Sequence, residues 1–97
     1  MTKYSVKINP RLSKQLEEHA RFIANVSKPA ALHFLAEFQA VTRQLSNNPY
    51  LYPLYGDPNL PPDTYHKAVF GKWYKVVYYI EDAAVYVDAV VDGRMMT

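Results

Sequence analysis

Apolar and polar residues alternate at the start of the chain and then change to a helical period. Residues 4–9 place apolar and polar side chains on opposite sides in turn, which is the period of a half-buried β-strand. Asn9 and Pro10 then supply an N-cap and a first-turn proline. The apolar positions that follow at helical spacing are Leu12, Leu16, Ala20 and Ile23. The pattern predicts a short strand followed by an amphipathic helix that ends near Val26.

A second helical stripe begins after Ser27 and Pro29, which again combine a cap with a proline near a helix start. Its apolar positions are Ala31, Leu32, Leu35, Phe38, Val41 and Leu45. The stripe ends at residues 46–49, where serine and two asparagines precede a proline. Because the link between the two helices is only a few residues long, we expect an antiparallel helical hairpin.

Proline dominates the next segment. Residues 49–64 carry five of the seven prolines, so this stretch cannot sustain a helix or a central strand. The same segment holds three tyrosines, which would be out of place in a solvated linker. We therefore predict an ordered loop whose aromatic rings pack over an edge of the core.

Three β-rich runs follow the loop, at 65–70, 73–80 and 84–91. Only short turns separate them, which predicts two hairpins in a meander. In the middle run, one set of alternating residues is uniformly core-like and is expected to meet the helices; it consists of Tyr74, Val76, Tyr78 and Ile80. The other set is expected to face away from the helices; it consists of Trp73, Lys75, Val77 and Tyr79.

These elements give the order β-α-α-β-β-β and an α+β fold class. We expect one domain over residues 1–97, with a four-stranded, mainly antiparallel sheet and the helical hairpin packed on one face. The chain has no cysteine, which excludes a disulfide-stapled secreted scaffold and favours the cytoplasm. No apolar run is long enough for an export signal or a membrane span.

The net charge is small. Lysine and arginine number 11 and acidic residues 9, for a formal charge of +2, which is milder than a nucleic-acid-binding domain usually shows. Residues 1–48 contain seven basic and three acidic side chains, whereas residues 65–97 contain four of each. Any contact of the C-terminal half with RNA must therefore depend on a few placed cations.

Four segments, taken together in their order and spacing, make the chain resemble the RelE/ParE superfamily. They are the opening strand with Asn9-Pro10, the hairpin end at 45–49, the run at 69–80, and the last strand ending in Gly93-Arg94. This superfamily forms the toxin half of bacterial type II toxin–antitoxin pairs. The resemblance covers almost the whole chain and implies neutralisation by a cognate antitoxin protein, whose disordered tail folds over the toxin as a helix or an added strand.

The resemblance also implies candidate catalytic residues. Ribosome-dependent members cleave mRNA with a ribose 2′-hydroxyl as nucleophile and use cations on the sheet to balance the developing phosphate charge. On that pattern Lys75 and Arg94 match two cation positions, and His66 and Lys67 fall near those of the preceding strand. The sequence departs from the pattern in two ways, because no tyrosine or histidine follows Arg94 and because lysine replaces the common arginine at 75.

Each of these residues has a plainer interpretation. Lys75 on an outward sheet face can be a solubilising side chain, and Arg94 can pair with Asp88 or Asp92. An isolated histidine such as His66 often only packs, although imidazole suits proton transfer. No histidine pair has metal-ligand spacing with a carboxylate, so we expect neither a metal nor a cofactor.

The outward aromatic residues have two interpretations. Trp73 and Tyr79 can stack nucleobases, or they can form, with Val77, an apolar surface that binds a partner. We favour partner binding, because the C-terminal half has no surplus positive charge to hold phosphate. A tryptophan would be a natural anchor for the antitoxin.

The first functional hypothesis is therefore a metal-independent mRNA endoribonuclease that acts on the ribosome, with Lys75 and Arg94 at the phosphate and His66 or Lys67 assisting. The alternative is a ParE-like inhibitor of DNA gyrase with no chemistry of its own. A third possibility is a non-toxic relic of the fold.

Overall fold

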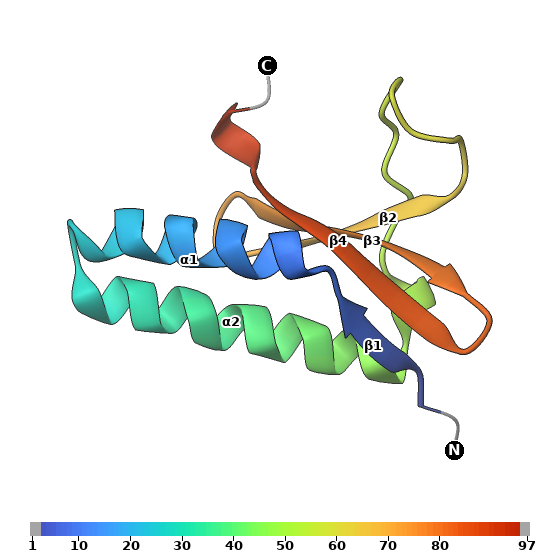
Figure 1. The fold of residues 1–97 in the computed structure, drawn as a ribbon, viewed down its shortest axis with the longest axis horizontal. Coiled ribbons are helices and arrows are strands. Elements are labelled where there is room, and N and C mark those ends of the chain that lie inside the picture. The colour runs from blue at the N-terminus through green and yellow to red at the C-terminus, as the bar shows by residue number, and fades with distance from the viewer. Residues whose placement is uncertain (1–2, 96–97) are drawn as a thin grey trace.

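A four-stranded sheet and a helical hairpin make up the fold (Figure 1). The computed structural model describes residues 3–95. Its elements are β1 (Ser5–Ile8), α1 (Pro10–Ala24), α2 (Lys28–Asn47), β2 (Tyr65–Phe70), β3 (Tyr74–Glu81) and β4 (Ala84–Asp92), with short 3-10 turns η1 (Pro49–Leu51) and η2 (Gly93–Met95). The order β-α-α-β-β-β is the predicted one.

The strands lie in the order β1-β4-β3-β2. The pairs β2–β3 and β3–β4 are antiparallel and form the predicted meander, whereas β1 lies parallel to β4. The sheet is therefore mainly antiparallel, as expected. The register between β3 and β4 shifts after Val77, which leaves Asp88 as the extra residue of a β-bulge.

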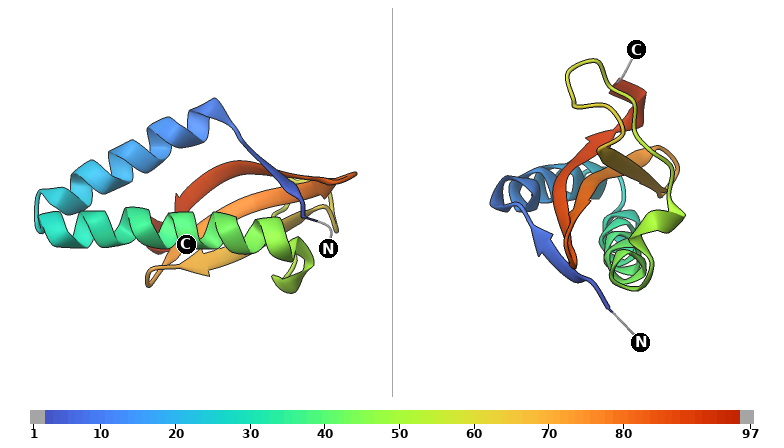
Figure 2. Two further views of the ribbon diagram at one scale, coloured as in Figure 1. Left: turned by 90° about the horizontal axis from the view of Figure 1, so that it is seen from below. Right: turned by 90° about the vertical axis from the view of Figure 1, so that its right-hand side faces the viewer.

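Both helices begin where their caps predict. The Asn9 side chain accepts a hydrogen bond from the amide of Arg11 at 2.9 Å, and the Ser27 hydroxyl accepts one from Ala30 at 3.2 Å. The two helices lie side by side as an antiparallel hairpin (Figure 2). No helix in the described part of the chain is long and apolar enough to cross a bilayer.

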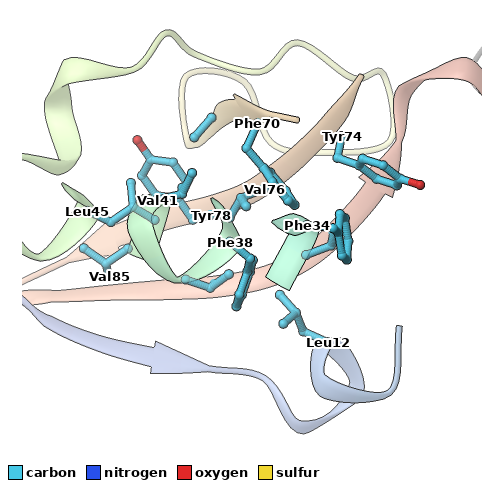
Figure 3. Close-up of a cluster of buried hydrophobic side chains, with 13 residues drawn as sticks. Leu12, Phe34, Phe38, Val41, Leu45, Phe70, Tyr74, Val76, Tyr78 and Val85 are labelled. Carbon is cyan, nitrogen blue, oxygen red and sulfur yellow. The ribbon is translucent and has the colours of Figure 1, made fainter. Parts of the chain in front are cut away.

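The core lies between the hairpin and one face of the sheet (Figure 3). Of the predicted inward residues of β3, Tyr74, Val76 and Tyr78 belong to it and the partly buried Ile80 packs against it; Tyr78 is fully buried. The Tyr78 hydroxyl donates a hydrogen bond of 2.6 Å to the carbonyl of Pro49, and burial raises the pKa of this phenol well above its ordinary value. That bond ties the middle strand to the start of the proline-rich loop.

The proline-rich loop runs along the outer edge of β2. The amide of Tyr55 donates to the carbonyl of Tyr65 at 2.7 Å, and the amide of Lys67 donates to the carbonyl of Pro53 at 3.0 Å. Tyr55 itself is only 9% exposed. The loop is thus ordered as predicted, and it covers part of the sheet face that is turned away from the helices.

Candidate functional site

Two of the four candidate catalytic residues share the sheet face turned away from the helices. Lys67 pairs with Val77, and Lys75 pairs with Val69 on one side and Val91 on the other. The Lys75 ammonium lies 5.7 Å from the centre of the Tyr55 ring. The two lysines therefore form a small basic area beside the proline-rich loop.

His66 lies on the opposite face. Its ring stacks on Tyr78 at 5.3 Å with an interplanar angle of 16°, and its Nδ1 lies 2.9 Å from the carbonyl oxygen of Tyr52. Because a carbonyl can only accept, Nδ1 donates this hydrogen bond. The sheet separates this imidazole from Lys67 and Lys75, and its contacts are those of a packed residue.

Arg94 follows the end of β4 and turns toward the helical hairpin. Its guanidinium donates two hydrogen bonds to the Asp92 carboxylate, at 2.9 and 3.2 Å, and lies 4.1 Å from the centre of the Trp73 ring. The hydrogen bonds from Arg94 hold the pKa of Asp92 below its usual range. Of the two carboxylates that the sequence offered to Arg94, Asp92 is therefore the partner.

The candidate residues thus have different surroundings: His66 lies on the opposite sheet face from Lys67 and Lys75, and Arg94 lies beside Trp73 with its guanidinium bound to Asp92. A phosphate group in contact with Lys75 on the outward face would not reach His66 across the sheet. The charge of Arg94 is already balanced by Asp92. In this arrangement the four groups do not converge on one reacting atom.

A larger feature lies between the tip of the hairpin and the β2–β3 turn. It is a cavity of about 640 Å³, which we call the hairpin groove. Its apolar lining consists of Phe22, Ile23, Val26, Ala30, Phe34 and Trp73. Although they are large apolar residues, Phe22 is 64% exposed and Val26 is 87% exposed. A clustered apolar surface of this kind typically marks a protein interaction site.

Polar groups surround the groove. Lys72 and Arg94 line it on the sheet side, and Glu37 lines it on the α2 side. The Glu37 carboxylate accepts a hydrogen bond from the amide of Gly71 at 2.6 Å and contacts His33 at 2.6 Å. Glu37 therefore fixes the β2–β3 turn against α2 beside the groove.

The three residues predicted to bind a partner lie in different surroundings. Trp73 precedes β3 and lines the hairpin groove, on the helix side of the sheet. Val77 faces away from the helices but is only 5% exposed, because it lies in the region covered by the loop that carries Tyr55. Tyr79 remains partly accessible on the outward face.

Tyr79 forms the centre of a row of three tyrosines across the sheet. Tyr65, Tyr79 and Tyr86 are lateral neighbours on three strands. Tyr79 stacks on Tyr86 with ring centres 4.9 Å apart, and Tyr65 meets Tyr79 edge to face at 5.4 Å. The Tyr65 hydroxyl donates to Asp88 at 3.1 Å. Because these aromatic rings contact one another, they leave little ring surface on which a nucleobase could stack.

The hairpin groove was missed by the sequence analysis. Phe22 stands next to the stripe position Ile23, and Val26 stands directly before the cap Ser27. Two apolar residues at the end of a helix, beyond the reach of the sheet, are the signal that would have indicated an exposed apolar tip. Residues 3–95 bring together no group of three metal-ligating side chains.

Residues 6–97 match the family described as ParE toxin of type II toxin-antitoxin system, parDE. No match was found among curated proteins.

Proposed function

The chain belongs to the ParE family of toxins from type II toxin–antitoxin systems, and on this premise we propose that it acts by binding DNA gyrase and not by cleaving RNA. The family implies an antitoxin partner. The identity of the target is the part that we propose.

The separation of His66 from Lys75, together with the pairing of Arg94 with Asp92, carries this proposal. Cleavage with a ribose 2′-hydroxyl needs cations and a proton-transfer group around a single phosphate. Here the imidazole and the lysine lie on opposite faces, and the guanidinium is engaged by Asp92. A toxin that acts by binding needs no such convergence.

The hairpin groove is the surface that we assign to the antitoxin. Its floor is apolar and its exposed residues Phe22 and Val26 protrude, which suits the apolar side of an amphipathic segment. Trp73 supplies the aromatic anchor that interfaces favour. Lys72 on the sheet side favours an acidic residue in the same segment.

Expression of the chain in a bacterial host separates the possible functions. Gyrase inhibition predicts filamentation and DNA damage with intact transcripts, and the Lys75→Ala, Arg94→Ala double variant should keep most of this effect. Rapid loss of protein synthesis with cleaved transcripts, abolished in the double variant, would contradict the proposal and support mRNA cleavage on the ribosome. No effect on growth would indicate a non-toxic relic of the fold.

The partner is tested by co-expression with the short reading frame on either side of the toxin gene. The product of one of them should co-purify with the chain and restore growth. Failure of both neighbours to do so would count against the antitoxin assignment.

A further inference from the structure

The surplus positive charge of this chain is concentrated at its start. Residues 3–16 contain no acidic residue and four cations, which are Lys3, Lys7, Arg11 and Lys14. All four side chains are exposed. Because β1 leads directly into α1 (Figure 1), the cations follow one another along the strand and the first turns of the helix. We call these four residues the N-terminal cation stripe.

No acidic neighbour in the sequence neutralises the N-terminal cation stripe. In the described part of the chain, none of its four cations forms an ion pair with a carboxylate. The next acidic residue along the helix, Glu17, binds Arg21 at 2.7 Å. The first turn of α1 also lacks an acidic residue, so the positive end of the helix dipole adds to the charge of the stripe.

The fold brings two carboxylates near the stripe. Asp57 and Asp88 line the same hollow as Arg11, and Asp88 also lines a hollow with Lys7. The oxygens of Asp88 accept hydrogen bonds from a tyrosine hydroxyl at 3.1 Å and an asparagine side-chain amide at 3.4 Å, and Asp57 accepts one from a backbone amide at 2.8 Å. Four cations and two carboxylates leave this surface with an excess of positive charge.

We propose that the N-terminal cation stripe contacts the phosphate backbone of duplex DNA held by gyrase. The inference rests on the proposed function, because gyrase supplies the DNA. Three of the four cations are lysines, which bind phosphate as point charges. Phosphate contacts position a protein on DNA without reading its sequence. A duplex carries one negative charge for about every 1.7 Å of its axis, so it offers a phosphate to each cation of the stripe.

The composition of the stripe favours DNA over a protein partner. Protein interfaces have an apolar core with large anchoring side chains. Within residues 3–16, Ile8 is the one large apolar side chain among the exposed residues, and it is 42% exposed. The hairpin groove, where the exposed apolar residues gather, lies elsewhere: Arg11 and Phe22 are eleven residues apart on α1, or about 16 Å along the helix.

The first experiment measures the inhibition of plasmid supercoiling by purified gyrase. The test variant is K7Q/R11Q, and the matched control is K28Q/R43Q, which removes the same charge from exposed positions on α2. The toxin concentration for half-inhibition should rise at least about fivefold in the test variant and less than about twofold in the control. Both variants should bind the antitoxin like the unmodified chain, which verifies that they fold.

The second experiment measures binding of the free chain to a labelled DNA duplex by fluorescence anisotropy. Four phosphate contacts predict that the logarithm of the binding constant falls with the logarithm of salt concentration at a slope of about −3.6, and K7Q/R11Q should show about half that slope. The control variant should keep the slope of the unmodified chain.

Equal inhibition of gyrase by the test and control variants would overturn the DNA contact while leaving the proposed function in place. Weaker inhibition by K7Q/R11Q with unchanged duplex binding would also overturn it, since the stripe would then bind an acidic surface of gyrase itself. If the unmodified chain does not inhibit gyrase at all, the proposed function fails and this inference fails with it.

Discussion

Truncating one exposed aromatic residue of the hairpin groove should weaken the antitoxin complex without destabilising the toxin. The residue is Phe22, which is 64% exposed in the free chain and lines the groove. An aromatic side chain buries roughly 200 Å² when it is fully covered, so roughly 130 Å² of Phe22 remains available to a partner. At about 25 cal/mol per Å², covering that area is worth about 3 kcal/mol.

Phe22→Ala keeps the Cβ, so the expected loss of binding free energy is about 2 kcal/mol, or roughly a 30-fold weaker complex. Because the side chain is mostly exposed, the free energy of unfolding should change by only about 0.5 kcal/mol or less. Calorimetric titration of the toxin with the antitoxin gives the affinity, and urea unfolding of the free variant gives its stability.

Leu32→Ala is the matched control for this measurement. Leu32 is 69% exposed on α2 and does not line the hairpin groove. The control should bind the antitoxin like the unmodified chain. Equal affinities of the Phe22 and Leu32 variants would refute the assignment of the groove to the antitoxin, whatever the effect on stability.

Three further predictions concern the fold. Tyr78→Phe removes a hydrogen bond that spans the core and should lower the free energy of unfolding by about 1–3 kcal/mol, whereas Tyr50→Phe at a 62% exposed ring should not, as measured by urea unfolding. Gly93→Ala places a Cβ against the backbone carbonyl oxygen of Trp73 and should lower the free energy of unfolding, measured by thermal unfolding, by about 1–3 kcal/mol. Gly56→Ala is the neutral control, because no other atom beyond its chain neighbours lies within 4 Å of a Cβ at that position. The pKa of Asp92 is lower in the folded chain than in the unfolded chain, so the ionised carboxylate stabilises the fold. This stabilisation is complete above the ordinary carboxyl pKa of about 3.9 and is lost as the pH falls through the pKa of the folded chain. When the free energy of unfolding is measured from neutral pH down to below the pKa of Asp92 in the folded chain, it should therefore fall less in D92N than in the unmodified chain.

The sequence predicts the elements of this fold because each has a strong local signal. Asn9 and Ser27 mark the helix starts, and the first of the three β-rich runs, at 65–70, coincides with β2. The alternation along β3 also predicts correctly that Tyr78 lies in the core. Such signals depend only on neighbouring residues, which is why single-sequence patterns suffice for them.

The surroundings of the candidate site depend on distant contacts that no local pattern contains. Trp73 leaves the expected outward face because β3 begins one residue later and the preceding turn directs the indole toward the hairpin. Val77 is covered by the loop that carries Tyr55, about 20 residues earlier in the sequence. The parallel pairing of β1 with β4 joins residues about 80 positions apart in the sequence.

The most direct test of the account is plasmid supercoiling by purified DNA gyrase in the presence of the purified chain. We predict that supercoiling stops, that added antitoxin restores it, and that the Lys75→Ala, Arg94→Ala variant still inhibits gyrase. Full gyrase activity, together with cleavage of mRNA when the same preparation is added to translating ribosomes, would contradict it.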